Sequence, residues 1–220
     1  MQAAVIVFPG SNRERDAAKA LERAMGKKPL IVWHRDSTLP KVDLIVLPGG
    51  FSYGDYLRTG AMAAHSPIMR EVVARAKKGV RVWGICNGFQ ILCETELLPG
   101  ILLRNASLKF VCRPVTLRVE NNDSDFTRLC KPEQEIKTIV AHGDGNYFAE
   151  PDVLKKLEDN RQIAFRYLDN PNGSINDIAG VFNKERNVLG HMPHPEDSVE
   201  PLHGSTDGAV LFESVAKALG

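Results

Sequence analysis

The sequence predicts an α/β protein with a doubly wound, mainly parallel sheet and a strand-rich insertion. Three short apolar runs, at residues 3–8, 44–47 and 80–85, have the continuous hydrophobic character of strands buried on both faces. Segments with helical spacing of apolar residues separate them, and strands that alternate with helices are typical of parallel sheets. Ligands of such sheets bind beyond the carboxyl ends of the strands, so we expect the functional site there.

The first half of the chain supplies further elements of this pattern. Ser11 and Glu14 match a capping box, which predicts a helix that ends at Gly26. A second strand is expected at residues 30–33, and a helix from about residue 60 to residue 78.

The second half is richer in strands. One clear helix, at about residues 153–159, interrupts them, and an amphipathic helix at residues 207–219 closes the chain. The strand candidates are residues 110–120, 136–140, 162–168, 178–182 and 188–189. No repeat or low-complexity linker marks a boundary, so we expect a single domain over residues 1–220.

The composition is that of an ordinary globular protein. Hydrophobic residues make up 43% and charged residues 25%, and the net charge is +1. We expect no nucleic-acid or membrane partner, because the chain has neither a basic cluster nor an apolar run of about 20 residues. The four cysteines include no C-x-x-C pair, which argues against a structural zinc site. The first residues do not resemble a secretory signal. Free thiols without such a signal predict a reducing, cytoplasmic location.

Residues 80–92, VRVWGICNGFQIL, carry the strongest functional signal. They predict a strand, a tight glycine-flanked turn and a helix, with Cys86 at the turn. Such a turn lifts one side chain clear of the sheet edge, where the positive end of the helix dipole favours thiolate over thiol. Cys86 is therefore the candidate nucleophile. The alternative is a buried, unreactive cysteine at the end of an apolar strand.

A thiolate nucleophile needs a base and a group that orients the base. His194 lies between two prolines in GHMPHPE, and Glu196 follows two positions later. In an extended segment, residues two apart project to the same side, so Glu196 would hold the imidazole while its other nitrogen faces Cys86. The alternative is a rigid surface turn with two solvated polar groups. His191 and His194 also form an H-x-x-H pair, but the sequence places no third ligand, so we expect no metal.

A tetrahedral intermediate needs hydrogen-bond donors for its oxyanion. The backbone N–H of Asn87 is one candidate, and the Gly49-Gly50 turn can supply a second; the alternative is that P-G-G is only a turn. His142, in AHGDGNY, is a loop residue that either touches the substrate or caps a turn.

These motifs resemble those of the class I (triad-type) glutamine amidotransferases. GICNGFQ is similar to the nucleophile turn of that family, PGGFSYGD at 48–55 to its oxyanion-side loop, and MPHPE at 192–196 to its His/Glu segment. The resemblance spans the whole chain and implies a flavodoxin-like sheet. It also implies that Cys86 attacks the side-chain amide of glutamine, that His194 transfers the proton, and that Glu196 orients His194. The residues implied to hold glutamine are Gly50, Phe51, Ser52 and Gln90.

The longer stretches PGGFSYGD, AHGDGNY and NPNGS, with NDIAG following, are closest to family members that act in purine biosynthesis. This implies that ammonia passes to a separate large synthetase subunit, with a small third subunit that bridges the two. ATP and Mg²⁺ are expected on the synthetase, because this chain has no G-x-x-x-x-G-K phosphate loop, and no cofactor is expected in the chain itself.

Three alternatives to this function remain. A cysteine amidase or peptidase-like hydrolase would use the same turn, another glutamine amidotransferase would serve histidine, pyridoxal phosphate or nucleotide synthesis, and a silent protein would only scaffold a synthetase. Two positions depart from the family pattern. His191 stands where an apolar residue is usual, and Asp197 where a basic residue is usual. They bear on partner contact and on the pKa of His194, and not on the reaction class.

Overall fold

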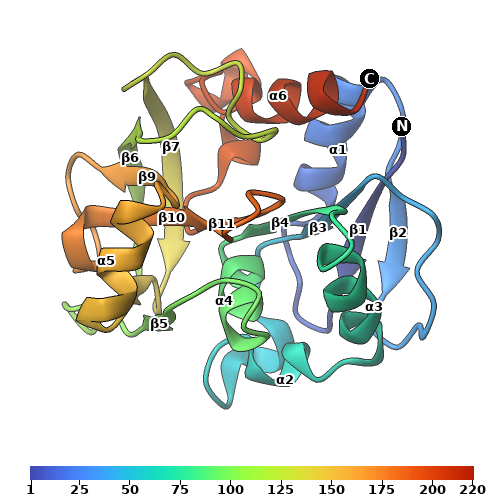
Figure 1. Ribbon diagram of the computed structural model, residues 1–220, viewed down its shortest axis with the longest axis horizontal. Coiled ribbons are helices and arrows are strands. Elements are labelled where there is room, and N and C mark those ends of the chain that lie inside the picture. The colour runs from blue at the N-terminus through green and yellow to red at the C-terminus, as the bar shows by residue number, and fades with distance from the viewer.

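The computed structural model describes all 220 residues, and its main feature is a nine-stranded mixed sheet (Figure 1). The strands of this sheet are β1 Ala3–Val7, β2 Leu30–Trp33, β3 Leu44–Leu47, β4 Arg81–Ile85, β6 Val111–Val119, β7 Glu135–His142, β9 Ile163–Tyr167, β10 Ile178–Phe182 and β11 Val188–His191. A separate antiparallel pair consists of β5 Ile101–Leu103 and β8 Asn146–Phe148.

The sheet has a parallel half and an antiparallel half. The parallel half runs in the order β2-β1-β3-β4-β11. This is the 2-1-3-4-5 order of flavodoxin-like sheets, with β11 as the fifth strand, so the predicted fold class is confirmed. The strands β10, β9, β6 and β7 continue the same sheet in antiparallel pairs. They come from the chain between β4 and β11, and they are the predicted strand-rich insertion.

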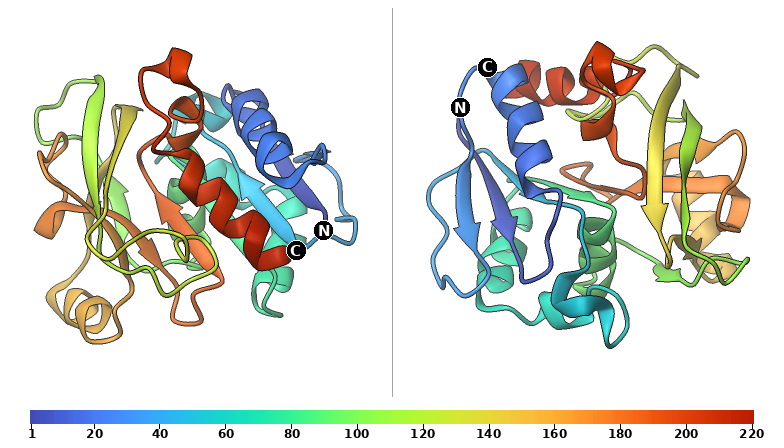
Figure 2. Two further views of the ribbon diagram at one scale, coloured as in Figure 1. Left: turned by 90° about the horizontal axis from the view of Figure 1, so that it is seen from above. Right: turned by 180° about the vertical axis from the view of Figure 1, so that it is seen from behind.

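Helices cover both faces of the parallel half. The helices are α1 Glu14–Met25, α2 Ala61–Ala64, α3 Pro67–Ala76, α4 Asn87–Glu94, α5 Pro151–Asp159 and α6 Ala209–Leu219. Figure 2 shows α1 and α6 together on one face, whereas α3 and α4 lie on the other. Helix α5 lies beside the antiparallel half (Figure 1). None of the helices is long and apolar enough to cross a membrane.

One hydrophobic core of 55 buried residues runs through both halves of the sheet. It extends from β1 to β7 and includes the inner faces of α1, α4 and α6. The strand β4 lies at its centre, where the Trp83 side chain is fully buried. Because β4 ends at the predicted nucleophile, a buried strand holds the turn that carries Cys86.

Two helix predictions were wrong in detail. The expected capping box is absent, because the Ser11 hydroxyl accepts a hydrogen bond from the Phe8 N–H at 3.0 Å and α1 begins without a side-chain cap. The single helix expected at 60–78 is broken into α2 and α3 between residues 64 and 67. Pro67 explains the break, since proline disfavours the helical conformation of the residue before it. The short strands β5 and β8 were not predicted, because three residues give no readable alternation.

The first turn of helix α4 packs directly against the backbone of the neighbouring strand β3. A Cβ added to Gly88 would lie 2.0 Å from the carbonyl oxygen of Leu47 in β3. The glycine therefore lets the first turn of α4 rest directly on the backbone of a neighbouring strand. This contact brings the start of the helix to the edge of the sheet.

We expect Gly88→Ala to destabilise the fold by about 3 kcal/mol or more, because the new methyl group must displace a buried backbone carbonyl. Gly143→Ala is the matched control, since its only neighbour would be a Phe110 ring carbon at 3.9 Å, and it should change stability by less than ~0.5 kcal/mol. Urea unfolding of both variants measures the difference. Equal stability of the two variants would show that α4 does not depend on this contact.

Candidate active site

Cys86 occupies the sharp turn between β4 and α4, in a backbone conformation that non-glycine residues rarely adopt. Its φ is 52° and its ψ is −107°. Such strain persists only where the surrounding structure enforces it. Here a Cβ on Gly84 would lie 2.6 Å from the backbone of Gly88, so the two flanking glycines bring strand and helix together while Cys86 itself takes the strained angles. This is the tight turn that the sequence predicts for a nucleophile.

Two distant parts of the chain meet at Cys86. Its N–H donates to the carbonyl oxygen of His191, at the end of β11, at 2.8 Å. Its sulfur lies 3.9 Å from the carbonyl oxygen of Ala141 in β7. The side chain is enclosed, with the residue only 4% exposed. Both halves of the sheet therefore contribute to the walls around the sulfur.

His194 and Glu196 form a buried pair beside this turn. The Nδ1 atom of His194 lies 2.7 Å from Oε1 of Glu196. Because an ionised carboxylate only accepts hydrogen bonds, Nδ1 carries the hydrogen. The other ring nitrogen, Nε2, is buried and has no hydrogen-bond partner within the protein. It is free for the nucleophile, as the sequence interpretation requires.

The segment that carries the pair is not extended, so the stated reason for their contact was wrong. Residues Pro195–Asp197 form a 3₁₀ turn that starts at His194. The turn folds Glu196 back toward the imidazole, whereas an extended chain would only have placed both side chains on one side. The pairing of His194 with Glu196 is as expected, but the local geometry that produces it differs.

The backbone of His194 is fixed by β7. Its N–H donates to the carbonyl oxygen of Ile139 at 2.8 Å, and its own carbonyl accepts from the Thr138 hydroxyl at 2.7 Å. The imidazole lies over the P-G-G turn, where a Cβ on Gly49 would be 2.6 Å from Cε1 of the ring. The antiparallel half of the sheet thus holds His194 against the parallel half.

The charges in this cluster support one another. Burial lowers the pKa of His194, but Glu196 and the nearby Cys86 sulfur outweigh that effect and raise it to about 10. Burial raises the pKa of Glu196, but His194 outweighs that effect and lowers it. The favoured state is an imidazolium against a carboxylate. Cys86, which lies close enough to raise the pKa of His194, completes the cluster.

Arg13 is a member of this region that sequence reasoning missed. It forms an ion pair with Asp197, and its Nε lies 4.0 Å from Oε1 of Glu196. The acidic residue at 197 therefore has a partner within the chain, where the family pattern would have a basic side chain. No sequence signal could reveal this pair, because Arg13 lies at the start of α1, far from the His/Glu segment.

Asn87 and Gln90 join α4 to the loop that follows β3. Asn87 accepts from the N–H of Ser52 at 3.3 Å and donates to Oε1 of Gln90 at 2.9 Å. Gln90 in turn donates to the carbonyl oxygen of Asp144 at 2.7 Å. The hydroxyl of Ser52 is buried without a partner. These residues meet next to Cys86, and their contact with glutamine stays a prediction.

The Gly50-Phe51 turn follows the carboxyl end of β3, next to the carboxyl end of β4, after which Cys86 lies. A Cβ on Gly50 would lie 2.6 Å from Cα of Ser11, so only glycine fits. Phe51 is 40% exposed, and its ring centre lies 6.2 Å from that of Phe110. The N–H of Asn87, the first residue of α4, has no partner within its helix. The two oxyanion candidates thus follow the carboxyl ends of the neighbouring parallel strands β3 and β4, and their contact with an oxyanion stays a prediction.

Both ring nitrogens of His142 have neighbours within the chain. Its Nδ1 lies 3.1 Å from Oδ1 of Asn105, and its Nε2 lies 3.4 Å from the side-chain nitrogen of Asn172. Burial, and then the charge of His194, lower its pKa to about 4, so the ring is neutral. Neither ring nitrogen is left for a substrate, and of the two sequence interpretations the geometry favours a residue that orders its loop.

The H-x-x-H pair does not act as a pair in this structure. Nε2 of His191 accepts from the indole N–H of Trp83 at 2.7 Å, whereas His194 bonds to Glu196. No three His, Cys, Asp or Glu side chains lie together as metal ligands would.

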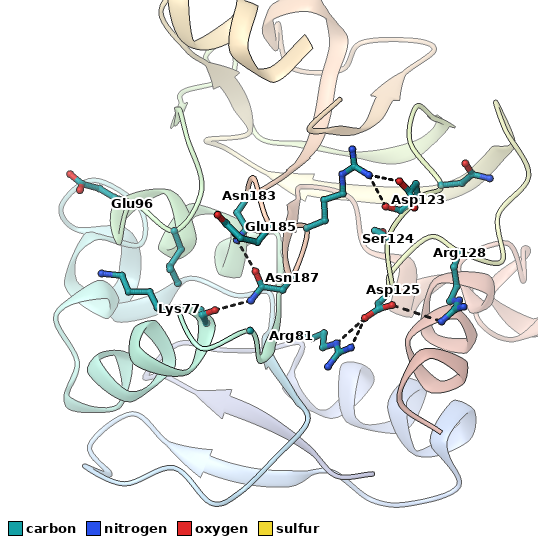
Figure 3. Close-up of a pocket in the computed structure, with 15 residues that line it drawn as sticks. Lys77, Arg81, Glu96, Asp123, Ser124, Asp125, Arg128, Asn183, Glu185 and Asn187 are labelled. Atoms are coloured by element: carbon teal, nitrogen blue, oxygen red, sulfur yellow. Dashed lines mark hydrogen bonds and ion pairs between the residues drawn. The ribbon is translucent and has the colours of Figure 1, made fainter. Parts of the chain in front are cut away.

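A cavity of about 940 Å³ lies at the amino end of β4 (Figure 3), whereas Cys86 follows the carboxyl end of that strand. It surrounds Arg81 at the start of β4 and Asn187 just before β11. Its charged groups neutralise one another, as in the ion pairs Arg81–Asp125 and Arg186–Asp123. The predicted nucleophile, by contrast, lies in a closed site.

Two buried imidazoles predict a loss of stability in mild acid. Burial lowers the pKa of both His142 and His191 to about 4, against 6.5 for an unperturbed group. Between these values the unfolded chain binds more protons, so each contributes stability that is present above pH 6.5 and is lost as the pH falls toward 4, by up to about 3 kcal/mol. Asp55, with its pKa raised to about 6 by burial and by Asp144, opposes this in part.

Urea unfolding at pH 7 and pH 5 checks this expectation. His191→Gln cannot titrate, so its stability should fall less between the two pH values than that of the unmodified protein. An equal fall in both proteins would show that protonation of His191 does not cause the loss of stability in acid.

Comparison with known proteins agrees with this geometry. A sequence model of the CobB/CobQ-like glutamine amidotransferase domain matches residues 1–209. A curated relative from Chelativorans sp. (strain BNC1), phosphoribosylformylglycinamidine synthase subunit PurQ, is 59% identical over 217 residues, which is 98% of each chain. The subunit of the same name from Brucella suis biovar 1 is 57% identical over 100% of this chain and 99% of its own.

A solved structure gives the same result for the fold. A chain of PurLQS from Thermotoga maritima superposes with a TM-score of 0.92 at 47% identity, over 100% of this chain and 99% of the other. The family match covers nearly the whole chain, and the relatives match it from end to end. This chain belongs to the CobB/CobQ-like glutamine amidotransferase family.

Proposed function

We propose that this chain is the glutaminase subunit of a phosphoribosylformylglycinamidine synthase, which converts phosphoribosylformylglycinamide to the amidine in purine biosynthesis. The observation that carries the proposal is the buried His194–Glu196 pair, whose free Nε2 belongs to the same cluster as the strained Cys86. This arrangement suits nucleophilic attack on an unreactive amide. The full-length relatives named as subunits of that synthase support the choice of partner enzyme.

The first half of the reaction forms a thioester. Before attack, the proton of the Cys86 thiol passes to Nε2 of His194, which gives the imidazolium described above. The thiolate sulfur then attacks the side-chain amide carbon of glutamine. The tetrahedral intermediate then collapses: the C–N bond breaks, and the imidazolium of His194 gives its proton to the departing nitrogen, which leaves as ammonia. Glu196 keeps Nδ1 of the ring protonated throughout, so Nε2 alone exchanges the proton.

The second half regenerates the cysteine. Water, deprotonated by His194, attacks the thioester carbon, and glutamate leaves as Cys86 regains its proton. Both tetrahedral intermediates need donors for a negatively charged oxygen. The N–H of Asn87 at the start of α4 and the Gly50 turn are the groups that we assign to this task. Gln90, Phe51 and Ser52 are assigned to the glutamine side chain.

The partner is the large synthetase subunit. The free chain encloses its nucleophile, and exposed apolar side chains lie on the loop beside it, with Tyr56 at 89% and Leu57 at 65% exposure. A protein that covers this loop would take these apolar side chains out of water. A partner there would also keep ammonia out of bulk water. We expect the isolated chain to be a weak glutaminase, because the partner completes the active site.

Three further parts of the proposal concern the assembly. A small third subunit bridges the chain and the synthetase. ATP and Mg²⁺ act on the synthetase, since the chemistry of Cys86 and His194 needs neither. All four cysteines are free, which suits a reducing cytoplasm.

We expect Cys86→Ala to lower glutamine-dependent synthesis by the assembled complex at least about 10⁴-fold, because no thioester can form. Synthesis from added ammonia should be unchanged, since the synthetase is intact. Cys112→Ala, at an exposed cysteine, is the control and should keep full activity. Glutamine hydrolysis that survives in Cys86→Ala would reject the proposed function.

A second measurement identifies the reactive thiol directly. A glutamine analogue with an electrophilic side chain should label Cys86 alone, because binding places it at that sulfur. Iodoacetamide, which carries no glutamine group, should label Cys112 first, because it is the one exposed cysteine of the four. Peptide mass spectrometry separates the two patterns, and labelling of all four cysteines by the analogue would mean that no site selects glutamine.

A further inference from the structure

A second buried histidine lies three residues before His194, in a chain of hydrogen bonds that the mechanism above does not use. His191, at the end of β11, is 1% exposed. Its Nε2 lies 2.7 Å from Nε1 of Trp83 in β4, and its Nδ1 lies 2.9 Å from the carbonyl oxygen of Pro193. The Phe165 ring packs edge-on against it, with ring centres 5.6 Å apart.

These two contacts allow only one form of the ring. An indole N–H is a donor only, so Nε2 of His191 must be the bare acceptor. Nδ1 then carries the hydrogen and donates it to the Pro193 carbonyl. A charged His191 would set an N–H against the N–H of Trp83, and burial lowers the pKa of His191 accordingly. The neutral ring satisfies both of its nitrogens.

The Pro193 carbonyl belongs to the same peptide group as the N–H of His194. That N–H donates to the carbonyl oxygen of Ile139 in β7 at 2.8 Å. His191 therefore holds one end of this peptide group and β7 holds the other. With both ends held, the peptide plane is fixed, and with it the direction in which the His194 side chain leaves the backbone. Pro193 donates no backbone hydrogen bond of its own that could do this.

We propose that His191 is a positioning residue for glutamine hydrolysis, which aims the imidazole of His194 at Cys86 through its hydrogen bond to the Pro193 carbonyl. The inference rests on the proposed glutaminase function. It assigns a task to a buried side chain that the mechanism above leaves unused. Trp83 serves as the donor that completes the hydrogen bonding of the ring, and its loss leaves the bond to Pro193 in place.

Three variants separate positioning from simple packing. His191→Leu removes the donor to Pro193, His191→Gln keeps one amide donor and one acceptor, and Trp83→Phe removes only the indole donor. In the assembled complex, we expect His191→Leu to lower kcat for glutamine hydrolysis by about 10- to 100-fold with KM little changed, since a misplacement of about 1 Å has effects of this size. His191→Gln and Trp83→Phe should stay within about threefold of the unmodified kcat.

Trp83→Phe also measures the effect of instability alone, because Trp83 is fully buried in the core and its truncation destabilises the fold. Equal losses of kcat in Trp83→Phe and His191→Leu would overturn the proposal, and so would an unchanged kcat in His191→Leu. A folded His191→Gln that loses as much activity as His191→Leu would overturn it as well.

Nitrogen-15 NMR of the imidazoles gives a readout that needs no activity. His191 should show a single neutral form protonated at Nδ1 from pH 5.5 to 8, and the Nδ1 proton of His194 should broaden or shift in His191→Leu but not in Trp83→Phe. A His191 ring protonated at Nε2, or an unchanged His194 signal in His191→Leu, would overturn the inference. Failure of the proposed function would appear separately, as glutamine hydrolysis that does not depend on Cys86.

Discussion

The close approach of α4 to the sheet is the constraint on which the rest of the site depends. Gly88 rests on the Leu47 carbonyl and Gly84 lies against Gly88, so the chain must turn within one residue. That residue is Cys86, which takes a φ of 52°. The strain is supported by a large buried core around β4. The site is therefore rigid where the nucleophile is held, which favours a fixed attack geometry over an adaptable one.

The antiparallel half of the sheet completes the site that the parallel half begins. Flavodoxin-like strands alone would present Cys86 at an open edge. Here β7 supplies the acceptor for the His194 N–H, the hydroxyl of Thr138 for its carbonyl, and the Ala141 carbonyl near the sulfur. The strand-rich insertion thus fixes the base, while the doubly wound sheet fixes the nucleophile. His194 and Glu196 are both buried, so water does not screen the attraction between their charges.

The sequence predicted most of the fold because its elements are local. Continuous apolar runs marked β1, β3 and β4, and Gly26 marked the end of α1 in a left-handed conformation with φ 68°. The sequence prediction failed where one side chain could form either of two local hydrogen bonds. The Ser11 hydroxyl could cap a helix or accept from Phe8, and only the turn after β1 settles which occurs. The break before Pro67 was readable, and was missed because apolar spacing continued across it.

For the site, the sequence by itself determined the chemistry: a cysteine at a glycine-flanked turn after a buried strand, and a His/Glu pair two residues apart. These patterns are local, so their residue types and spacing are visible in the chain. Only the tertiary structure decided how the groups meet. The anchoring of His194 by β7, the ion pair of Arg13 with Asp197 and the contact of His191 with Trp83 join residues far apart in the chain. Such pairings follow from strand order and register, which no short stretch of sequence specifies.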